Sequence, residues 1–465
     1  MELVKKIKIE WVLIALLLFL GMATRFYHFG QPNQIVFDEI YFSKFATDYF
    51  KGEYYFDIHP PLAKLMMAGW AKTSGAEIPI SFDFKNIGKE YTDNFYKYLR
   101  FLVSFFGALF PLIIYFFTKE LFQNKIAGFL AGLLVVFDNA LLTQSRLILM
   151  DIFLLFFGFL GLWFLLLSRK KVIYSKSWLW FIIFSGLFLT ASFAVKWTGL
   201  IFIGVAGFIL LFDCIKNKQG KVFINQALIL FFVGFIVYYL IFAAHLSLLF
   251  YSGSGDAFMT PSFQKTLIGN KYYEDTSIKP AGTFLKFLEL NKTMYTANAS
   301  IKATHSYGSQ WYTWPFLLRP IYYWFNSSEI GQSSRIYLQG NPLIWWLGLI
   351  TFIYWLFWLI KQLFKKVKDS YFLPILILIV GYIGNMMAYV FVDRVAFLYH
   401  YFPSLIFLII GLAAFFVKYY TKSKIIIFTL ILIVIMFFQF FAPLSYGLPM
   451  TDASFQERVW FKSWQ

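Results

Sequence analysis

Carboxylates gather in one stretch near the start of the chain, FDEIYFSKFATDYFKGEYYFDIHPPLAK at residues 37–64. Asp38 and Glu39 come first and are surrounded by apolar residues. A carboxylate held against apolar surface, with a cation within reach, can be tuned to act as a general base. The pair is therefore a candidate for proton-transfer chemistry. Later acids of the stretch, such as Asp57, fit equally well on the solvated face of an amphipathic helix.

Basic side chains occur in short turns that are otherwise poor in charge, at Arg100, Arg146, Lys196 and Arg394. Each lies beside an apolar run, where an ionisable side chain is costly and usually has a partner or a function. One interpretation is that these side chains extend to lipid headgroups or pair with carboxylates such as Asp151. The other is that they act together and bind an anionic lipid headgroup beside a general base.

The composition indicates the kind of scaffold that must position these groups. The chain has 465 residues, of which 60% are hydrophobic and only 14% charged. Apolar blocks of about 18–25 residues are long enough to cross a bilayer as helices. The net charge of +17 comes from Lys and Arg in short loops between these blocks, which is a topology signal and does not favour nucleic-acid binding. Cys214 is the only cysteine, so a disulfide framework is excluded.

Hydropathy predicts an all-α polytopic membrane protein with about eleven transmembrane helices in one domain, residues 1–465. The expected spans are 11–27, 99–118, 126–143, 147–168, 178–194, 197–215, 222–246, 341–361, 371–391, 395–417 and 424–443. Basic residues before the first span place the N-terminus in the cytoplasm. The C-terminus and two long loops, 28–98 and 247–340, are then outside. We expect short amphipathic helices in both loops, and the first apolar run is interpreted as a retained span.

Motifs of soluble enzymes are missing from the sequence: it contains no GxxxxGK[ST] and no HExxH, and we find no GxGxxG of the dinucleotide type. An activated substrate attached to a lipid fits the architecture better than a soluble nucleotide donor. His59, with Asp57, could ligate a metal ion, but a histidine before two prolines is more often part of a turn. No metal or other cofactor is therefore predicted.

The carboxylate-rich stretch resembles the first outer loop of the protein O-mannosyltransferases. That family carries an Asp-Glu pair after the first span and then an aromatic-Asp-x-His-Pro-Pro-x-x-Lys motif, here FDIHPPLAK. Its later marks also match in order, at Asp57, His59 and Lys64, at Arg100, at Ser145, Arg146 and Asp151 in SRLILMD, at Lys196, Trp197 and Gly199 in KWTGL, and at His305, Tyr307, Ser309, Trp314 and Arg319.

Two departures from the family pattern are visible. The prokaryotic members usually read His-Pro-Tyr where this chain has His305-Ser306-Tyr307. The eukaryotic members insert a β-trefoil domain into the second long loop, which is too short here to hold one. The chain therefore resembles the prokaryotic type.

The resemblance implies a GT-C glycosyltransferase that moves mannose from a polyprenyl- or dolichyl-phosphate carrier to Ser or Thr hydroxyls of secreted or membrane proteins. It implies that Asp38 is the general base and that Glu39 orients the base or the acceptor. Lys196, Arg394 and Arg100 are then expected to bind the donor phosphate. It further implies a multi-pass protein of a prokaryotic plasma membrane with an outward-facing site. Direct attack gives inversion at C1; a retaining route would need a second carboxylate about 5 Å from the acid/base.

Two rival functions remain open. Another GT-C enzyme would use the same kind of carrier with a different sugar, or with a lipid or glycan acceptor. A lipid transporter or channel without catalytic activity would place its ionisable groups near the middle of the membrane. The FDIHPPLAK motif favours protein mannosylation over the first, and charges near the ends of the spans argue against the second.

Overall fold

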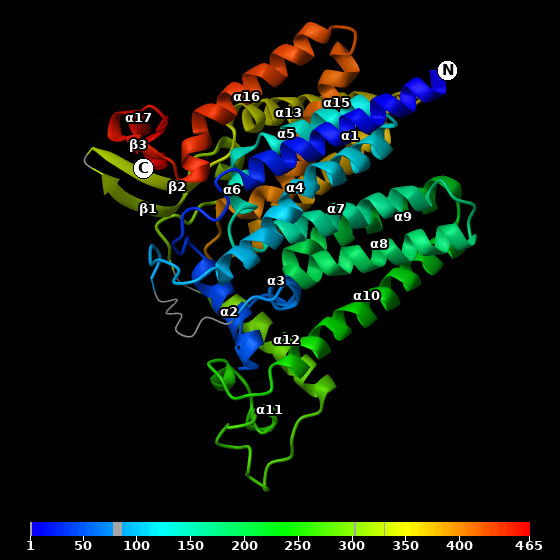
Figure 1. Ribbon diagram of the computed structural model, residues 1–465. Helices are drawn as coiled ribbons and strands as arrows, with labels where there is room; N and C mark the ends of the chain where they lie inside the picture. The colour runs from blue at the N-terminus through cyan, green and yellow to red at the C-terminus, as the bar shows by residue number, and fades with distance from the viewer. Residues whose placement is uncertain (1, 78–85, 302–303, 330) are drawn as a thin grey trace.

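Long apolar helices packed side by side dominate the fold (Figure 1). The computed structural model describes residues 2–77, 86–301, 304–329 and 331–465. Within these ranges ten helices are long and apolar enough to cross a membrane, which confirms the predicted polytopic helical fold. They are α1 (Glu2–Phe26), α4 (Phe95–Phe122), α7 (Asp151–Ser168), α8 (Lys176–Val195), α9 (Leu200–Asn217), α10 (Gly220–Leu248), α13 (Pro342–Leu363), α14 (Phe372–Ala388), α15 (Phe402–Tyr420) and α16 (Lys424–Tyr446).

The span predicted at residues 126–143 is two helices, α5 (Lys125–Val136) and α6 (Asn139–Gln144). The break is at Asp138, whose carboxylate accepts from the Leu141 backbone N–H at 2.9 Å and from Trp345 Nε1 at 2.7 Å. An aspartate that satisfies a free N–H group favours the start of a new helix. Because α4 ends and α7 begins at opposite ends of the bundle, α5 and α6 together return the chain across it.

Ion pairs mark the two ends of the bundle. At one end, Lys196 after α8 pairs with Asp151 at the start of α7, and at the other, Lys170 after α7 pairs with Glu120 near the end of α4. The 18 residues of α7 span about 27 Å at 1.5 Å per residue. The two ends are thus separated by roughly the thickness of a bilayer's hydrocarbon core.

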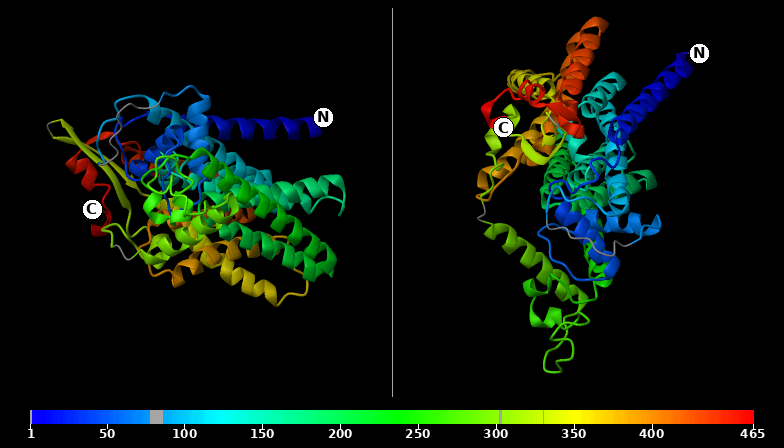
Figure 2. Two further views of the ribbon diagram at one scale, coloured as in Figure 1. Left: turned by 90° about the horizontal axis from the view of Figure 1, so that it is seen from below. Right: turned by 60° about the vertical axis from the view of Figure 1, so that its left-hand side comes forward.

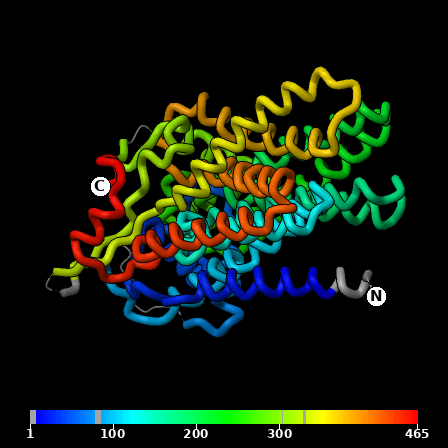
Figure 3. Tube along the Cα trace, turned by 90° about the horizontal axis from the view of Figure 1, so that it is seen from above, coloured from blue at the N-terminus to red at the C-terminus, as the bar shows by residue number. Residues whose placement is uncertain are grey.

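Close helix contacts hold the centre of the bundle. α7 and α15 are buried along most of their length, whereas α10 is exposed along almost all of it. Gly158 in α7 permits one such contact, because a Cβ atom there would lie 2.3 Å from the ring of Phe202 in α9. Figure 3 shows α1 along one side of the bundle, with the two termini at opposite ends.

Two long segments join the helices at the Asp151 end. The first, between α1 and α4, contains α2 (Glu39–Lys51) and α3 (Leu62–Thr73). The second, between α10 and α13, contains η2 (Asp256–Phe258), α11 (Pro261–Gln264), α12 (Thr283–Ser300) and η3 (Trp311–Phe316). Its α11 region projects away from the bundle (Figures 1 and 2).

A small antiparallel sheet, which was not predicted from the sequence, takes two strands from the second segment and one from the chain after α16. It has the order β1-β2-β3, from β1 (Ile321–Glu329), β2 (Gln332–Leu338) and β3 (Pro449–Thr451). Ile321 pairs with Leu338 in the first ladder and Gln332 with Thr451 in the second. The chain after α16 thus adds a strand to a distant hairpin. The remaining short helices are η1 (Trp197–Gly199), η4 (Tyr389–Phe391), η5 (Leu398–Tyr401), α17 (Asp452–Gln456) and η6 (Lys462–Trp464).

Candidate active site

Asp38 is the residue directly before α2, and its carboxylate does not cap that helix. Among the described residues, none donates a hydrogen bond to this half-buried carboxylate. The preceding Phe37 has a φ of 49°, a left-handed conformation that costs a non-glycine residue about 1–2 kcal/mol. Its ring stacks on Tyr323 of β1 with a centroid distance of 4.0 Å. At this turn Asp38 thus presents a carboxylate that does not cap α2.

Glu39 has the opposite environment, because it is fully buried and paired with Arg100 of α4. The guanidinium donates to both carboxylate oxygens, from Nε at 2.7 Å and from Nη2 at 2.6 Å. The same carboxylate accepts from the backbone N–H groups of Val36 at 3.0 Å and Ile148 at 2.9 Å, and from the Tyr91 hydroxyl at 3.2 Å. Glu39 therefore fixes the start of α2, and with it the position of Asp38.

Arg100 is committed to this pair and to the chain around it. It is only 1% exposed, and its remaining N–H donors bind the backbone carbonyls of Gly30, Pro32 and Gln34. We expected Arg100 to bind the donor phosphate, but its guanidinium donors are directed at Glu39 and at backbone carbonyls. A guanidinium whose donors are already used inside the protein is better suited to positioning.

The FDIHPPLAK motif forms a closed turn leading into α3. Lys64 is buried, forms an ion pair with Asp57, and donates to the backbone carbonyl of His59 at 2.8 Å. Burial, together with the cations Lys196, Lys64 and Arg394, holds the pKa of His59 well below its usual range. His59 is therefore a neutral imidazole beside several positive charges.

Lys196 is a cation within electrostatic reach of Asp38. Its ammonium pairs with Asp151 at 2.7 Å and lies 5.0 Å from the centroid of the Tyr399 ring. Gln144 donates to the other oxygen of Asp151 at 2.6 Å and accepts from the Tyr323 hydroxyl at 2.8 Å. This chain of contacts links Lys196 to Tyr323, on which Phe37 stacks.

Arg394 lies between α14 and α15 and lines a cavity of about 530 Å³. Its guanidinium donates to Asn298 Oδ1 at 2.9 Å, and the Asn298 amide donates to the backbone carbonyl of Ile58 at 2.7 Å. Asn298 thus couples Arg394 to the turn containing His59. The cavity is also lined by residues of the second long segment, among them His305 and Ser309.

The other predicted site residues make contacts outside the Asp38 turn. Arg146 binds the backbone carbonyls of Tyr27 and His28 after α1, so it anchors that helix end. Trp197 donates to Tyr238 of α10 at 3.1 Å, beside Lys196 in the chain. Tyr307 stacks on Tyr322 of β1 with a centroid distance of 5.9 Å, and its backbone N–H donates to His305 Nδ1.

The electrostatic environment of Asp38 favours the protonated carboxyl group. Burial raises its pKa to about 7; Lys196 opposes this rise, while Asp151 and Asp57 add to it. Desolvation is therefore a larger effect on the pKa of Asp38 than the nearby cation Lys196. A carboxylate with a pKa near neutrality can accept a proton efficiently at physiological pH.

Sequence reasoning missed Gln144, Tyr323, Tyr399 and Asn298. Gln144 directly precedes the SRLILMD segment, which is the only sequence signal near it. Asn298 lies in an Asn-Ala-Ser triplet, a pattern that gives no sign of a contact with Arg394. Within the described residues no group of three His, Cys, Asp or Glu side chains could hold a metal ion.

Comparison with known families decides the affiliation. The family model for dolichyl-phosphate-mannose-protein mannosyltransferases matches residues 15–250, and that for the C-terminal four-transmembrane region of protein O-mannosyltransferases matches residues 283–464. The chain belongs to the protein O-mannosyltransferase family. This confirms the resemblance drawn from the FDIHPPLAK motif.

Two curated members of the protein O-mannosyltransferase family show the extent of the similarity. Dolichyl-phosphate-mannose–protein mannosyltransferase 4 of Schizosaccharomyces pombe is 34% identical over 302 residues, covering 60% of this chain and 38% of the relative. Protein O-mannosyltransferase 1 of Drosophila pseudoobscura is 34% identical over 263 residues, covering 54% of this chain and 29% of the relative. The matched region is thus less than half of each relative.

Solved structures identify the fold as GT-C. The S. cerevisiae protein O-mannosyltransferase Pmt1–Pmt2 complex, bound to its sugar donor, matches with a TM-score of 0.89 at 20% identity, covering 98% of this chain and 92% of that one. The Archaeoglobus fulgidus oligosaccharyltransferase matches with a TM-score of 0.57 at 13% identity, covering 97% and 57% of the two chains. At these identities the similarity shows a common fold.

Proposed function

We propose that this chain transfers mannose from a polyprenyl- or dolichyl-phosphate-mannose donor to Ser or Thr hydroxyls of proteins. The observation that carries the proposal is Asp38, an unpaired carboxylate with a pKa near 7 within electrostatic reach of Lys196. Family membership supports the choice of sugar and carrier.

The reaction uses these groups as base and anion site. The acceptor hydroxyl oxygen attacks C1 of mannose while Asp38 takes its proton. The bond between C1 and the phosphate oxygen breaks, and the carrier leaves as a phosphomonoester with additional negative charge. Lys196 and Arg394 stabilise this charge. We assign Arg100 and Glu39 to positioning Asp38. Attack from the side opposite the phosphate inverts the configuration at C1.

The test is a transfer assay with purified protein, polyprenyl-phosphate-mannose and a Ser/Thr-rich peptide. We expect mannosylated peptide whose linkage is inverted relative to the donor, and equal turnover after EDTA treatment. A parallel arm replaces the mannose donor with a polyprenyl-phosphate-linked pentose. Transfer in that arm alone would contradict the proposal.

Lys196→Ala should lower kcat/KM for the donor by about 30- to 1000-fold, because loss of one charge-stabilising donor raises the barrier by roughly 2–4 kcal/mol. Arg394→Ala should lower it in the same direction. Lys422→Ala, an exposed lysine between α15 and α16, is the control and should leave turnover unchanged. Wild-type turnover by both Lys196→Ala and Arg394→Ala at limiting donor would exclude the assignment.

We also infer that the active-site end of the bundle faces outside the cytoplasm, because the lysine-rich short loops lie at the other end. In a Cys214→Ala background, Ser306→Cys should react with a membrane-impermeant maleimide on intact cells, whereas Lys171→Cys should react only after lysis. Both positions are exposed. The reverse pattern would overturn the orientation. Residence in the plasma membrane of a prokaryote stays a prediction.

A further inference from the structure

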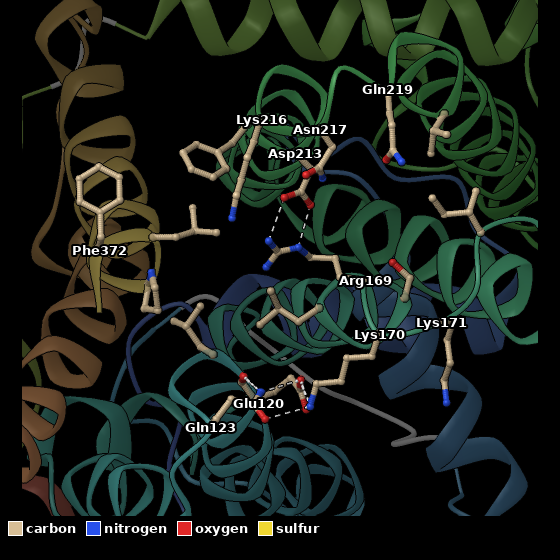
Figure 4. Close-up of a pocket in the computed structure, with 18 of the residues that line it drawn as sticks. Glu120, Gln123, Arg169, Lys170, Lys171, Asp213, Lys216, Asn217, Gln219 and Phe372 are labelled. Atoms are coloured by element: carbon tan, nitrogen blue, oxygen red, sulfur yellow. Dashed lines mark hydrogen bonds and ion pairs between the residues drawn. The ribbon is translucent and has the colours of Figure 1, made fainter. Parts of the chain in front are cut away.

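A second, larger cavity of about 1110 Å³ lies at the end of the bundle far from Asp38. It is bounded by the ends of α4, α7 and α9 and the starts of α10 and α14 (Figure 4). Its walls carry five cationic side chains, Arg169, Lys170, Lys171, Lys216 and Lys368, and three carboxylates, Glu120, Asp213 and Asp369. The cavity therefore has an excess of positive charge.

Part of that charge is neutralised by ion pairs that tie the walls together. Arg169 binds Asp213 through two hydrogen bonds, from Nε at 2.7 Å and Nη2 at 2.9 Å, and Lys170 pairs with Glu120 at 2.5 Å. In the described part of the chain, neither Lys171 nor Lys216 has an ion pair. Figure 4 shows Lys216 projecting toward the Arg169–Asp213 pair, with Lys171 at the edge. Among the described residues Lys368 also has no ion pair, and its ammonium donates to backbone carbonyls. These three lysines supply the uncompensated charge.

An apolar groove of about 420 Å³ adjoins this cavity and runs between α8, α9 and α10. Val222 lines the cavity and the next residue, Phe223, lines the groove. The groove has free space beside Gly207, where an added Cβ atom would have no heavy atom within 4 Å. The charged cavity thus leads into the apolar groove on the exposed side of the bundle.

We propose that the cavity and groove together bind an anionic phospholipid. Its phosphate lies near Lys216 and Arg169, and one acyl chain lies in the groove. The cavity is about one hydrocarbon thickness from Lys196, at the depth of the lipid headgroups of the opposite leaflet. Each lysine at such a depth raises the affinity for an anionic lipid by about fivefold. The bound lipid is distinct from the mannose donor, whose phosphate belongs at Lys196.

The headgroup is tested by native mass spectrometry of the full chain titrated with phosphatidylglycerol. The double variant Lys171→Glu/Lys216→Glu should weaken binding by about tenfold or more. Lys422→Glu makes a charge change in a loop outside the cavity and should stay within about twofold of wild type. Equal binding by wild type, variant and control would overturn the proposal.

Two further arms separate the lipid from other ligands. Zwitterionic phosphatidylcholine should bind more weakly than phosphatidylglycerol. Inorganic phosphate should raise the melting temperature of the protein far less than phosphatidylglycerol does. Stabilisation by inorganic phosphate equal to that by phosphatidylglycerol would identify a soluble-anion site and contradict the lipid.

The groove is tested by filling it. Gly207→Phe should reduce phosphatidylglycerol binding, because the ring would occupy the acyl-chain slot. Gly204→Phe is the matched control: it is in the same helix, is equally open, and does not line the groove. Unchanged binding by Gly207→Phe, or equal losses by both variants, would exclude the groove. Since the readout is lipid binding, neither result depends on mannosyl transfer.

Discussion

Asp38→Asn is expected to reduce turnover by about 10²–10⁴-fold, the usual loss when a general base is removed. Asparagine has nearly the same shape but cannot take the acceptor's proton. Donor binding should survive, because Lys196 and Arg394 are untouched. The measurement is single-turnover transfer to a Ser/Thr peptide alongside donor binding. Near-wild-type turnover by Asp38→Asn would contradict its role as the base.

The pH profile gives a second readout of the same group. Burial raises the pKa of Asp38 to about 7, so the carboxylate is ionised above and protonated below that pH. In wild type, kcat/KM should therefore fall about tenfold per pH unit below about pH 7 and level off above it. Asp38→Asn should lack this acid limb. A wild-type profile that is flat between pH 5 and 8 would place the base elsewhere.

The melting temperature of Asp38→Asn shows whether its loss of turnover comes from the chemistry or from a damaged fold. A carboxyl group whose folded-state pKa is raised binds its proton more tightly in the folded protein, so its contribution to stability is lost as pH rises through about 7. Removing that charge should leave the melting temperature of Asp38→Asn at pH 8 equal to or above that of wild type. A lower melting temperature would indicate a structural role.

Glu39→Gln is expected to destabilise the protein, because it leaves the Arg100 guanidinium buried without a counter-charge. Breaking a buried ion pair from one side typically costs about 3–5 kcal/mol. Turnover should fall because α2 no longer holds Asp38 in place. Thermal unfolding in detergent gives the stability change, and the acid limb of the pH profile should persist in the remaining activity.

The double variant Glu39→Leu/Arg100→Met is the matched control. Replacing both members of a buried pair with apolar residues is often neutral or stabilising, so it should regain much of the lost melting temperature. An additive loss, equal to the sum of the losses in Glu39→Leu and Arg100→Met measured separately, would show that the pair is not a unit. Unchanged stability in Glu39→Gln would contradict the positioning role.

Residue types and spacing identified the acids and cations, but only the family resemblance assigned different roles to Asp38 and Glu39, and it assigned Arg100 to the phosphate. Asp38 and Glu39 are adjacent and chemically similar, yet one is unpaired and the other is fully engaged by Arg100, 61 residues away. That division depends on which way each side chain leaves the turn at Phe37. Hydropathy located the spans because each must cover the same apolar thickness.

Features created by long-range contacts were beyond local reasoning. Asp138 divides a predicted span by capping α6, and its carboxylate is also held by Trp345, about two hundred residues later. Gln144 joins the site through Tyr323 of a hairpin that receives its third strand from the chain after α16. Neither residue differs in type or spacing from an ordinary helix-end polar residue.

The Asp151–Lys196 pair closes the hairpin of α7 and α8 at its open end, and this bears on biosynthesis. A single charged side chain at the centre of a bilayer costs about 2.5–3.5 kcal/mol on insertion scales. If the two helices enter the membrane as a unit, carboxylate and ammonium cross together as a neutral pair. The newly made hairpin then delivers Lys196 with its charge already compensated, before the partners from later helices have been synthesised.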